Sequence, residues 1–270
     1  MFQRILENGE VLYLPRLGFE LLPEERRFLS VQWSDAKSKN INLRPPADTL
    51  RGAVGEPSDL LQIRAMLLRY AKHSEQLITA LLPNYLPHLQ RAGTSFRPFE
   101  VERRETSWRK DDTRLHADSF PSNPTRGVRL LRVFTNVSLD GKPRVWRVGE
   151  PFARFAAKFL PRTNMPLPGS AWLLHALRIT KSRRTPYDHL MLQLHDSVKA
   201  DLEYQRGAAQ QEIAFAPRST WLVFSDQVLH AAMSGQFMFE QTFYLDPKGL
   251  AYPQMSPLRV LESLTGRQLL

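Results

Sequence analysis

The sequence contains no cysteine among its 270 residues. This absence excludes disulfide bonds, thiolate metal ligands and a cysteine nucleophile. Any metal that the chain binds must therefore be held by histidine, aspartate, glutamate or water. A chain without cysteine is also consistent with a reducing compartment.

Long apolar runs are absent as well. No stretch approaches the ~20 residues that a membrane-spanning helix needs. The first residues, MFQRILENGEVLYLPRLGF, lack the charged region followed by an apolar region that marks a signal peptide. We therefore expect a cytoplasmic protein.

Acidic residues are outnumbered: 27 Asp and Glu face 37 Lys and Arg, for a net charge of +10. This surplus favours an anionic partner such as nucleic acid, an anionic bilayer, or a phosphorylated or carboxylated substrate. The basic residues form clusters between the expected strands, around Arg103, Arg104, Arg109, Lys110 and Arg147. We expect a basic face around a site, with Arg109, Lys110 and Arg147 in contact with substrate. A solvated basic surface without a partner is the alternative.

The clearest helix lies in the N-terminal third of the chain. Pro57, Ser58 and Asp59 open a segment, ending near Pro83, in which apolar residues recur at three- and four-residue spacing. Residues 40–52 and 83–99 contain several prolines and are interpreted as a loop and a connection.

Strand character begins near residue 100. β-Branched and aromatic residues predict strands at 128–137, 143–148, 211–215, 220–226 and 237–245, and a weaker alternation favours strand at 101–104 and 107–118. Helices are expected at 151–160, 170–179 and 187–205. This order predicts a mainly β domain decorated by helices: an N-terminal mixed or helical extension (1–95), a β core (96–250) with a helical insert at about 150–205, and a C-terminal tail (251–270). Two domains divided near residue 100 are the alternative.

His116 and Asp118 stand two positions apart in RLHADSFPSNPTRGVRLLRVFTNV. On an extended strand, residues i and i+2 point to the same face, so both side chains can meet one ion. His230, which follows the expected strand at 220–226, could supply a second imidazole. Two histidines and one carboxylate are the donor set of non-haem Fe(II) oxygenases, which leaves positions for a bidentate ligand and O₂. A hydrogen-bonded surface pair is the alternative for His116 and Asp118.

Three further residues lie near these candidate ligands in the sequence or on the helix at 187–205. Asp226 is expected either to orient His230 as a hydrogen-bond acceptor or to stabilise a turn. His189 and His195 lie six positions apart on the expected helix, so they cannot share one face as ligands. They are expected to be structural or adjacent to substrate.

The sequence resembles the bacterial Kdo hydroxylases, a family of Fe(II)/2-oxoglutarate dioxygenases. Besides the three candidate ligands, the resemblance rests on HADSFPSNPTRGVRLLRVFTNV, GKPRVWRVGEPF, YDHLMLQLHDSVKADLEYQ and TWLVFSDQVLHAAMSGQFMFEQTFYL, and it covers about residues 95–246. It implies a double-stranded β-helix (a jelly roll, cupin-like) and Fe(II) held by His116, Asp118 and His230, with 2-oxoglutarate and O₂ as co-substrates.

The same resemblance implies a reaction and a location. Kdo, 3-deoxy-D-manno-oct-2-ulosonic acid, would be hydroxylated at C3 in Kdo-lipid A, the inner core of lipopolysaccharide, to the 3-hydroxylated sugar Ko, with release of succinate and CO₂. A basic protein without a span would then associate peripherally with the anionic inner face of the inner membrane. No nucleic-acid partner is expected, because no nucleic-acid-binding motif accompanies the charge.

One departure from the family concerns the carboxylate of 2-oxoglutarate that lies far from the metal. Many members bind it with Arg or Lys some ten residues after the second histidine, where this chain has Glu240 and Gln241. Glutamate would repel the anion, and a carboxylate buried without a cation is costly. The binding cation is therefore expected elsewhere on the core strands.

Alternation along the strands selects the candidates. Arg132 shares a face with Asn136, and Arg144 stands on the next strand, so Arg132 or Arg144 is expected to bind 2-oxoglutarate bidentately. Asn136 or Gln241 would add hydrogen bonds. Arg129 is kept in reserve, because a bulge would reverse the alternation.

Two other functions stay open from the residues alone. The first is a 2-oxoglutarate dioxygenase that acts on another glycan, a small molecule or a protein side chain. The second is a non-catalytic jelly roll that binds an anionic polymer and holds no metal.

Overall fold

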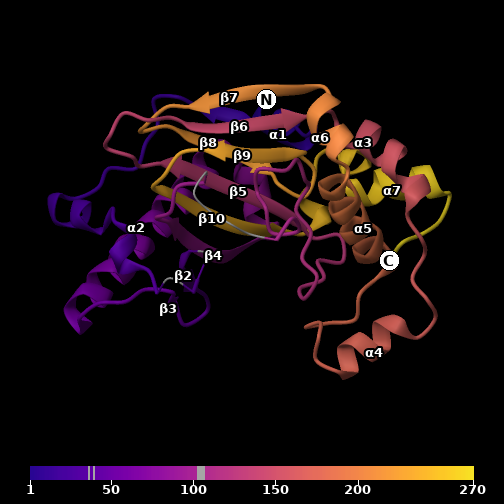
Figure 1. Ribbon diagram of the computed structural model, residues 1–270, viewed down its shortest axis with the longest axis horizontal. Coiled ribbons are helices and arrows are strands. Elements are labelled where there is room, and N and C mark those ends of the chain that lie inside the picture. Colours follow the sequence, from indigo (N-terminus) through magenta and orange to yellow (C-terminus); the bar gives the residue numbers. More distant parts are fainter. Residues whose placement is uncertain (36, 39, 102–106) are drawn as a thin grey trace.

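Two antiparallel sheets form the centre of the protein, for which a computed structural model describes residues 1–35, 37–38, 40–101 and 107–270 (Figure 1). The larger sheet contains, from edge to edge, β1 (Leu12–Leu14), β8 (Thr220–Phe224), β5 (Arg129–Asn136), β10 (Met238–Leu245), β4 (Leu89–Arg97), β2 (Ile41–Arg44) and β3 (Thr49–Arg51). The smaller sheet contains β7 (Gln210–Phe215), β6 (Arg144–Gly149) and β9 (His230–Ser234).

The chain passes repeatedly between the two sheets. After β5 in the larger sheet it enters β6 and β7 in the smaller one, returns through β8, crosses to β9 and ends in β10. Buried side chains from both sheets meet in one apolar cluster, which includes Phe134, Trp146, Phe215, Trp221 and Met238. This is the double-stranded β-helix, or jelly roll, that the sequence resemblance implied.

The helices cover both ends of this core. They are α1 (Phe2–Glu7), α2 (Pro57–Leu81), α3 (Phe152–Phe159), α4 (Ser170–Ala176), α5 (Pro186–Ala200), α6 (Leu202–Gly207) and α7 (Pro257–Thr265). Short 3₁₀ helices lie at Pro23–Phe28, Val31–Trp33, Pro83–His88, Leu160–Arg162, Pro247–Gly249 and Pro253–Met255. Figure 1 shows α2 at one end of the molecule and α3, α5, α6 and α7 gathered at the other. None of the helices in the described residues is long and apolar enough to cross a bilayer.

Local sequence explains the two helices that matter most for the core and the site. On α2, Met66, Leu67 and Tyr70 recur at helical spacing and pack against buried residues of the sheet such as Phe96. At the start of α5, the Thr185 side chain accepts a hydrogen bond from Asp188 N, and the Asp188 carboxylate accepts from Thr185 N, a reciprocal capping box. The cap fixes where α5 begins and therefore which of its side chains face the sheets.

Three expectations about local structure are corrected. Residues 89–97 are not a connection but β4, and residues 40–52 are not a loop but contain the β2–β3 hairpin. Proline is confined to positions outside these strands, so it did not prevent them from pairing. Conversely, the described residues from 107 to 118 contain no strand beyond an isolated bridge at His116. Residues 102–106, which include Arg103 and Arg104 and most of the weak strand expected at 101–104, lie outside the described part.

Candidate metal centre and cavity

The side chains of His116, Asp118 and His230 converge, as the sequence predicted: their potential ligand atoms all lie within 4.8 Å of one another. The backbone brings them together. His116 and His230 form an antiparallel bridge with two hydrogen bonds, His116 N to His230 O and His230 N to His116 O, both 2.9 Å. Asp118 N donates to Ser225 O at 2.7 Å, and this bond fastens Asp118 to the residue that follows β8.

Backbone carbonyls set the orientation of both imidazoles. His116 Nδ1 lies 2.7 Å from Arg114 O, and His230 Nδ1 lies 2.8 Å from Val228 O. Because a carbonyl only accepts, each Nδ1 carries the proton and each Nε2 presents a lone pair. His116 Nε2 is 3.7 Å from Asp118 Oδ1, so the unprotonated nitrogen faces the carboxylate. Two nitrogen donors and one oxygen donor are the set that suits Fe(II).

Burial and neighbouring charge hold these groups in the protonation states of metal ligands. Burial lowers the pKa of both imidazoles, and the proximity of His230 lowers the pKa of His116 further. Burial alone would raise the pKa of Asp118, but the Arg132 guanidinium and the two histidines outweigh it and hold that pKa well below its usual range. Neutral imidazoles beside an ionised carboxylate are what a divalent cation requires.

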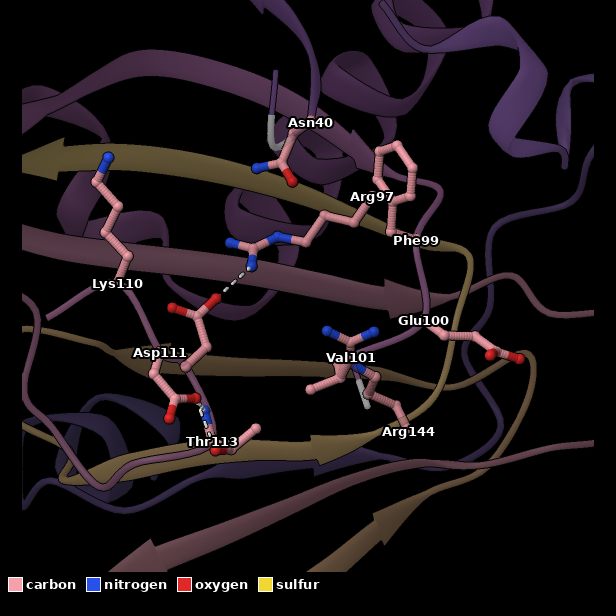
Figure 2. Close-up of a pocket in the computed structure, with 10 residues that line it drawn as sticks. Asn40, Arg97, Phe99, Glu100, Val101, Lys110, Asp111, Thr113 and Arg144 are labelled. Atoms are coloured by element: carbon pink, nitrogen blue, oxygen red, sulfur yellow. Dashed lines mark hydrogen bonds and ion pairs between the residues drawn. The ribbon is translucent and has the colours of Figure 1, made fainter. Parts of the chain in front are cut away.

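A cavity of about 870 Å³ opens at these three residues. Its lining includes seven Lys and Arg side chains against four Asp and Glu, so the cavity favours anions. The basic members are Lys37, Arg97, Arg109, Lys110, Arg132, Arg144 and Lys199. A pocket of about 40 Å³ adjoins it and shares part of its lining, and Figure 2 shows Arg97, Lys110 and Arg144 around this pocket.

Arginines and carboxylates alternate along one wall of the cavity. Arg132 lies 3.2 Å from Asp118 Oδ2 and 3.2 Å from Glu240 Oε1. Glu240 also pairs with Arg97, which lies 3.6 Å from Asp112. The expectation that Glu240 would repel an anion is therefore corrected, because two guanidinium groups compensate its charge.

Arg144 is the other arginine that the sequence suggested for binding 2-oxoglutarate, and it reaches the cavity from the smaller sheet. Its Nη1 donates to Gly235 O at 2.9 Å. A Cβ at Gly235 would lie 2.9 Å from Pro143 O, so only glycine allows the chain to pass this close to β6. Trp146, two residues along the same face, stacks on the His230 ring with centroids 4.9 Å apart. Arg144 therefore lies on the same face of β6 as the ring that stacks on His230.

Of the residues expected to touch substrate, Arg109 and Lys110 line the cavity and Arg147 does not. Arg109 Nε lies 3.1 Å from Asp196 Oδ2 on α5. Arg147 has the opposite parity to Arg144 and Trp146 on β6 and turns away, where it contacts Met233 and the carbonyl of Thr113.

The residues expected to assist 2-oxoglutarate lie outside the cavity lining. Gln241 points to the other face of β10, where its amide bonds to Thr94 and to backbone carbonyls. Asn136 shares a face with Arg132 but stands at the end of β5, where it donates to the carbonyls of Lys142 and Phe215. Gln241 directly follows Glu240, so strand alternation turns it to the other face of β10. Asn136 is the last residue of β5 and therefore lies at the end of that strand.

Arg129 and Asp226 pair with each other behind the site, with Arg129 Nε 2.6 Å from Asp226 Oδ2. No bulge reverses the β5 parity, so the reserve candidate Arg129 faces away from Arg132. Asp226 does not orient His230, since the Val228 carbonyl does so. It accepts instead from the Arg129 side chain and the backbone N–H of Leu130, both on β5, and so ties the residues after β8 to that strand.

Several cavity residues were missed from the sequence. Arg97 lay in the segment interpreted as a connection. Leu192 and Lys199 were missed as well. Together with Asp196 and with His195, which was expected to be structural or adjacent to substrate, they line the cavity, and their spacing of three and four on α5 places them on one helix face. The His195 ring meets the His116 ring edge-on, with centroids 5.5 Å apart. That helical spacing was the signal by which this wall could have been found.

A double-stranded β-helix that carries two histidines and a carboxylate in the lining of a basic cavity defines the class of non-haem Fe(II) oxygenases. The sequence profile of the 3-deoxy-D-manno-oct-2-ulosonic acid (Kdo) hydroxylase family matches residues 1–268. The chain therefore belongs to the Kdo hydroxylase family.

Solved structures of the Kdo hydroxylase KdoO, a non-haem Fe(II) α-ketoglutarate-dependent dioxygenase, agree with this. The apo form is 48% identical with a TM-score of 0.96 and covers 99% of this chain and 90% of its own. The form with α-ketoglutarate (2-oxoglutarate) and Fe(III) is 47% identical, TM-score 0.96, covering 100% and 90%. The cobalt(II) form is 48% identical, TM-score 0.97, covering 99% and 90%. No curated protein sequence matches the chain.

Proposed function

We propose that this protein hydroxylates C3 of Kdo in Kdo-lipid A, using Fe(II), 2-oxoglutarate and O₂. The observation that carries the proposal is the convergence of His116, Asp118 and His230 in the lining of a basic cavity, in a chain of the Kdo hydroxylase family. When bound, Fe(II) with 2-oxoglutarate and O₂ supplies the oxidation that replaces a C–H hydrogen by hydroxyl, while 2-oxoglutarate becomes succinate and CO₂.

The protein's own contribution begins with the metal ligands. Fe(II) would be held by the Nε2 atoms of His116 and His230 and by a carboxylate oxygen of Asp118. The Arg114 and Val228 carbonyls keep the two imidazole rings in their orientation. Ligands preset by the backbone bridge need little reorganisation when the ion binds. The remaining coordination positions would face the cavity.

Arg144 is the proposed partner for the distal carboxylate of 2-oxoglutarate. Arg132 already lies between Asp118 and Glu240, so much of its charge is compensated by two carboxylates. Its role is to keep Asp118 ionised and oriented. Arg144 lines the same cavity from the opposite sheet, beside Trp146, and its planar guanidinium suits a bidentate bond to a carboxylate.

The substrate would bind toward the outer part of the cavity, near Arg109, Lys110 and Lys199. Kdo is a sugar acid, and lipid A carries phosphates, so both parts of the substrate need cations. Lys199 is buried and donates to Arg109 O at 2.9 Å, which makes it a fixed charge rather than a mobile surface lysine. The basic lining thus favours the proposed substrate over neutral glycans.

The lipid part of the substrate implies a place of action. We place the protein at the inner face of the inner membrane, held peripherally by attraction between its net charge of +10 and anionic lipid. This location lets the substrate remain in the bilayer while its sugar enters the cavity.

The decisive experiment incubates the purified protein with Fe(II), 2-oxoglutarate and Kdo₂-lipid A, first without and then with O₂. We expect succinate release only with O₂, stimulated by Kdo₂-lipid A, and a product heavier by one oxygen in mass spectrometry. Fragmentation then locates the hydroxyl at C3. Succinate release that a panel of other glycans stimulates equally well would reject Kdo as the substrate.

A further inference from the structure

The segment that carries α4 has an unusual charge pattern. From Pro151 to Tyr187 the chain has no Asp or Glu, but it has seven Lys and Arg. In the whole chain, acidic residues number nearly three for every four basic ones, so this stretch is strongly biased. We call residues 161–184 the α4 arm.

The α4 arm exposes large apolar side chains at its tip. Leu167 is 78% exposed, Leu177 61%, Trp172 58%, Ile179 53% and Leu173 51%. None of α4 is buried, and within the described residues the arm contributes to none of the four hydrophobic clusters of the protein. Figure 1 shows α4 apart from the sheets and from α3, α5 and α7. Single exposed apolar residues are ordinary, but a contiguous group marks an interaction site.

Both ends of the arm are fastened to parts of the active-site region. At the first end, Asn164 exchanges hydrogen bonds with Gln193 of α5, at 2.9 and 2.6 Å. At the second end, Lys181 N donates to Ser122 O at 3.0 Å and Arg184 Nη2 donates to Pro121 O at 2.7 Å. Pro121 and α5 both line the cavity, so whatever binds the arm is held beside the cavity.

We propose that the α4 arm docks the protein on an anionic bilayer. Trp172, Leu173 and Leu177 would enter the boundary between headgroups and acyl chains, while exposed cations such as Lys181 and Arg183 pair with lipid phosphates. An apolar tip flanked by cations and free of acidic residues complements such a surface, and tryptophan favours the bilayer interface. The inference deepens the proposed function, since it names the segment that meets the membrane carrying the substrate.

Binding to vesicles that contain no Kdo lipid tests the arm separately from catalysis. We expect co-sedimentation with vesicles of phosphatidylethanolamine and phosphatidylglycerol, and weak binding to phosphatidylcholine alone. The double variant Trp172→Asp, Leu173→Asp should bind at least about tenfold more weakly. Leu61→Asp, on the 67% exposed Leu61 of α2, places a single aspartate on an apolar surface position outside the arm, and this control should bind nearly like the wild type.

Charge reversal tests the second component. Lys181→Glu combined with Arg183→Glu should weaken binding by about tenfold or more. The control pair Lys142→Glu and Arg206→Glu makes the same change of net charge at exposed positions outside the arm, and should weaken binding much less. A tryptophan emission shift to shorter wavelength on adding vesicles should disappear in Trp172→Phe, because Trp146 and Trp221 are buried in the core and the half-buried Trp33 and Trp108 lie outside the arm.

Several results would overturn the proposal. Equal binding by the arm variants and the controls would do so, as would equal binding to phosphatidylcholine. A concentration-dependent dimer that the Trp172 and Leu173 changes dissociate would instead identify a second copy as the occupant. Activity separates this inference from the proposed function: arm variants should retain succinate release with detergent-dispersed Kdo₂-lipid A but lose it with vesicle-embedded substrate. If Kdo lipid is hydroxylated neither in detergent nor in vesicles, the proposed function is wrong, but the vesicle-binding experiment still tests the arm.

Discussion

His116 and His230 exchange both of their backbone hydrogen bonds across one antiparallel bridge, each 2.9 Å long. The bridge places the centroids of the two imidazole rings 4.7 Å apart. The two candidate ligands are therefore positioned by main-chain pairing, and side-chain rotation is limited by the carbonyls that accept from each Nδ1.

Replacing either histidine should abolish metal binding without unfolding the protein. We expect His116→Ala and His230→Ala to show no stoichiometric Co(II) absorbance and no succinate release, because each removes one of three ligands. Backbone pairing at both positions is retained. His189→Ala changes a histidine of α5 that is outside the cavity lining; it is the control and should bind Co(II) normally. Stoichiometric Co(II) in His116→Ala would refute the ligand assignment.

Arg144→Leu should raise the KM for 2-oxoglutarate by about 10- to 100-fold, the effect of losing a charge-assisted bidentate bond. Metal content should stay at the wild-type level, because the cation that pairs with Asp118 is Arg132. The measurement is succinate release against 2-oxoglutarate concentration, with Co(II) titration in parallel. An unchanged KM would remove Arg144 as the partner of the co-substrate.

Arg132→Leu should behave differently, since Arg132 lies 3.2 Å from Asp118. Loss of this cation should raise the pKa of Asp118 and weaken Co(II) binding, most strongly at acidic pH. Titrating Co(II) at pH 5.5 and 7.5 reports the effect. If Arg132→Leu raises only the KM for 2-oxoglutarate and leaves Co(II) binding unchanged at both pH values, the two arginines have the opposite roles.

Glu240→Gln should destabilise the fold by about 3 kcal/mol, because it leaves two arginines beside a neutral partner in a buried place. Urea unfolding of the metal-free protein measures the change. Glu212→Gln, at an exposed position of β7, is the matched control and should change the free energy of unfolding by less than about 0.5 kcal/mol. Equal free energies of unfolding for the two variants would show that the ion pairs of Glu240 with Arg97 and Arg132 do not stabilise the fold.

The stability that Glu240 contributes should depend on pH in a defined direction. Burial raises its pKa, but Arg132 and Arg97 outweigh burial and lower the pKa below the model-compound value of 4.5. The folded state thus binds the proton less readily than the unfolded state, so the contribution is complete above pH 4.5 and falls as pH drops through the folded pKa. The stability difference between wild type and Glu240→Gln should therefore shrink on acidification. A difference that grows toward low pH would contradict this sign.

The parts of the protein that sequence predicted well are those with strong local patterns. The α2 helix has an apolar face and a proline start, and β5 and β10 are dense in β-branched and aromatic residues, so each was found near its actual bounds. The three candidate ligands, which converge in the structure, were selected because His116 and Asp118 stand two positions apart and His230 follows the expected strand at 220–226, and the resemblance pointed to the same three. The family match confirmed the resemblance.

The parts that the sequence did not predict depend on contacts between residues that are far apart in the sequence. β4 contains Gly93 and polar residues, and it is a strand because β10 and β2 pair with it on either side. Arg97 at its end and Glu240 on β10 become partners only through that pairing. A single sequence shows a glutamate where a cation was expected, but it does not show which arginines lie across from it.

The place of β10 between β4 and β5 has a consequence for synthesis. At about 5–20 residues per second, the roughly 140 residues between β4 and β10 take on the order of ten seconds to leave the ribosome. Through that interval β4 has no strand on one side, and the segment with His116 has no bridge. A metal site built from His116, Asp118 and His230 can therefore form only after most of the chain has left the ribosome.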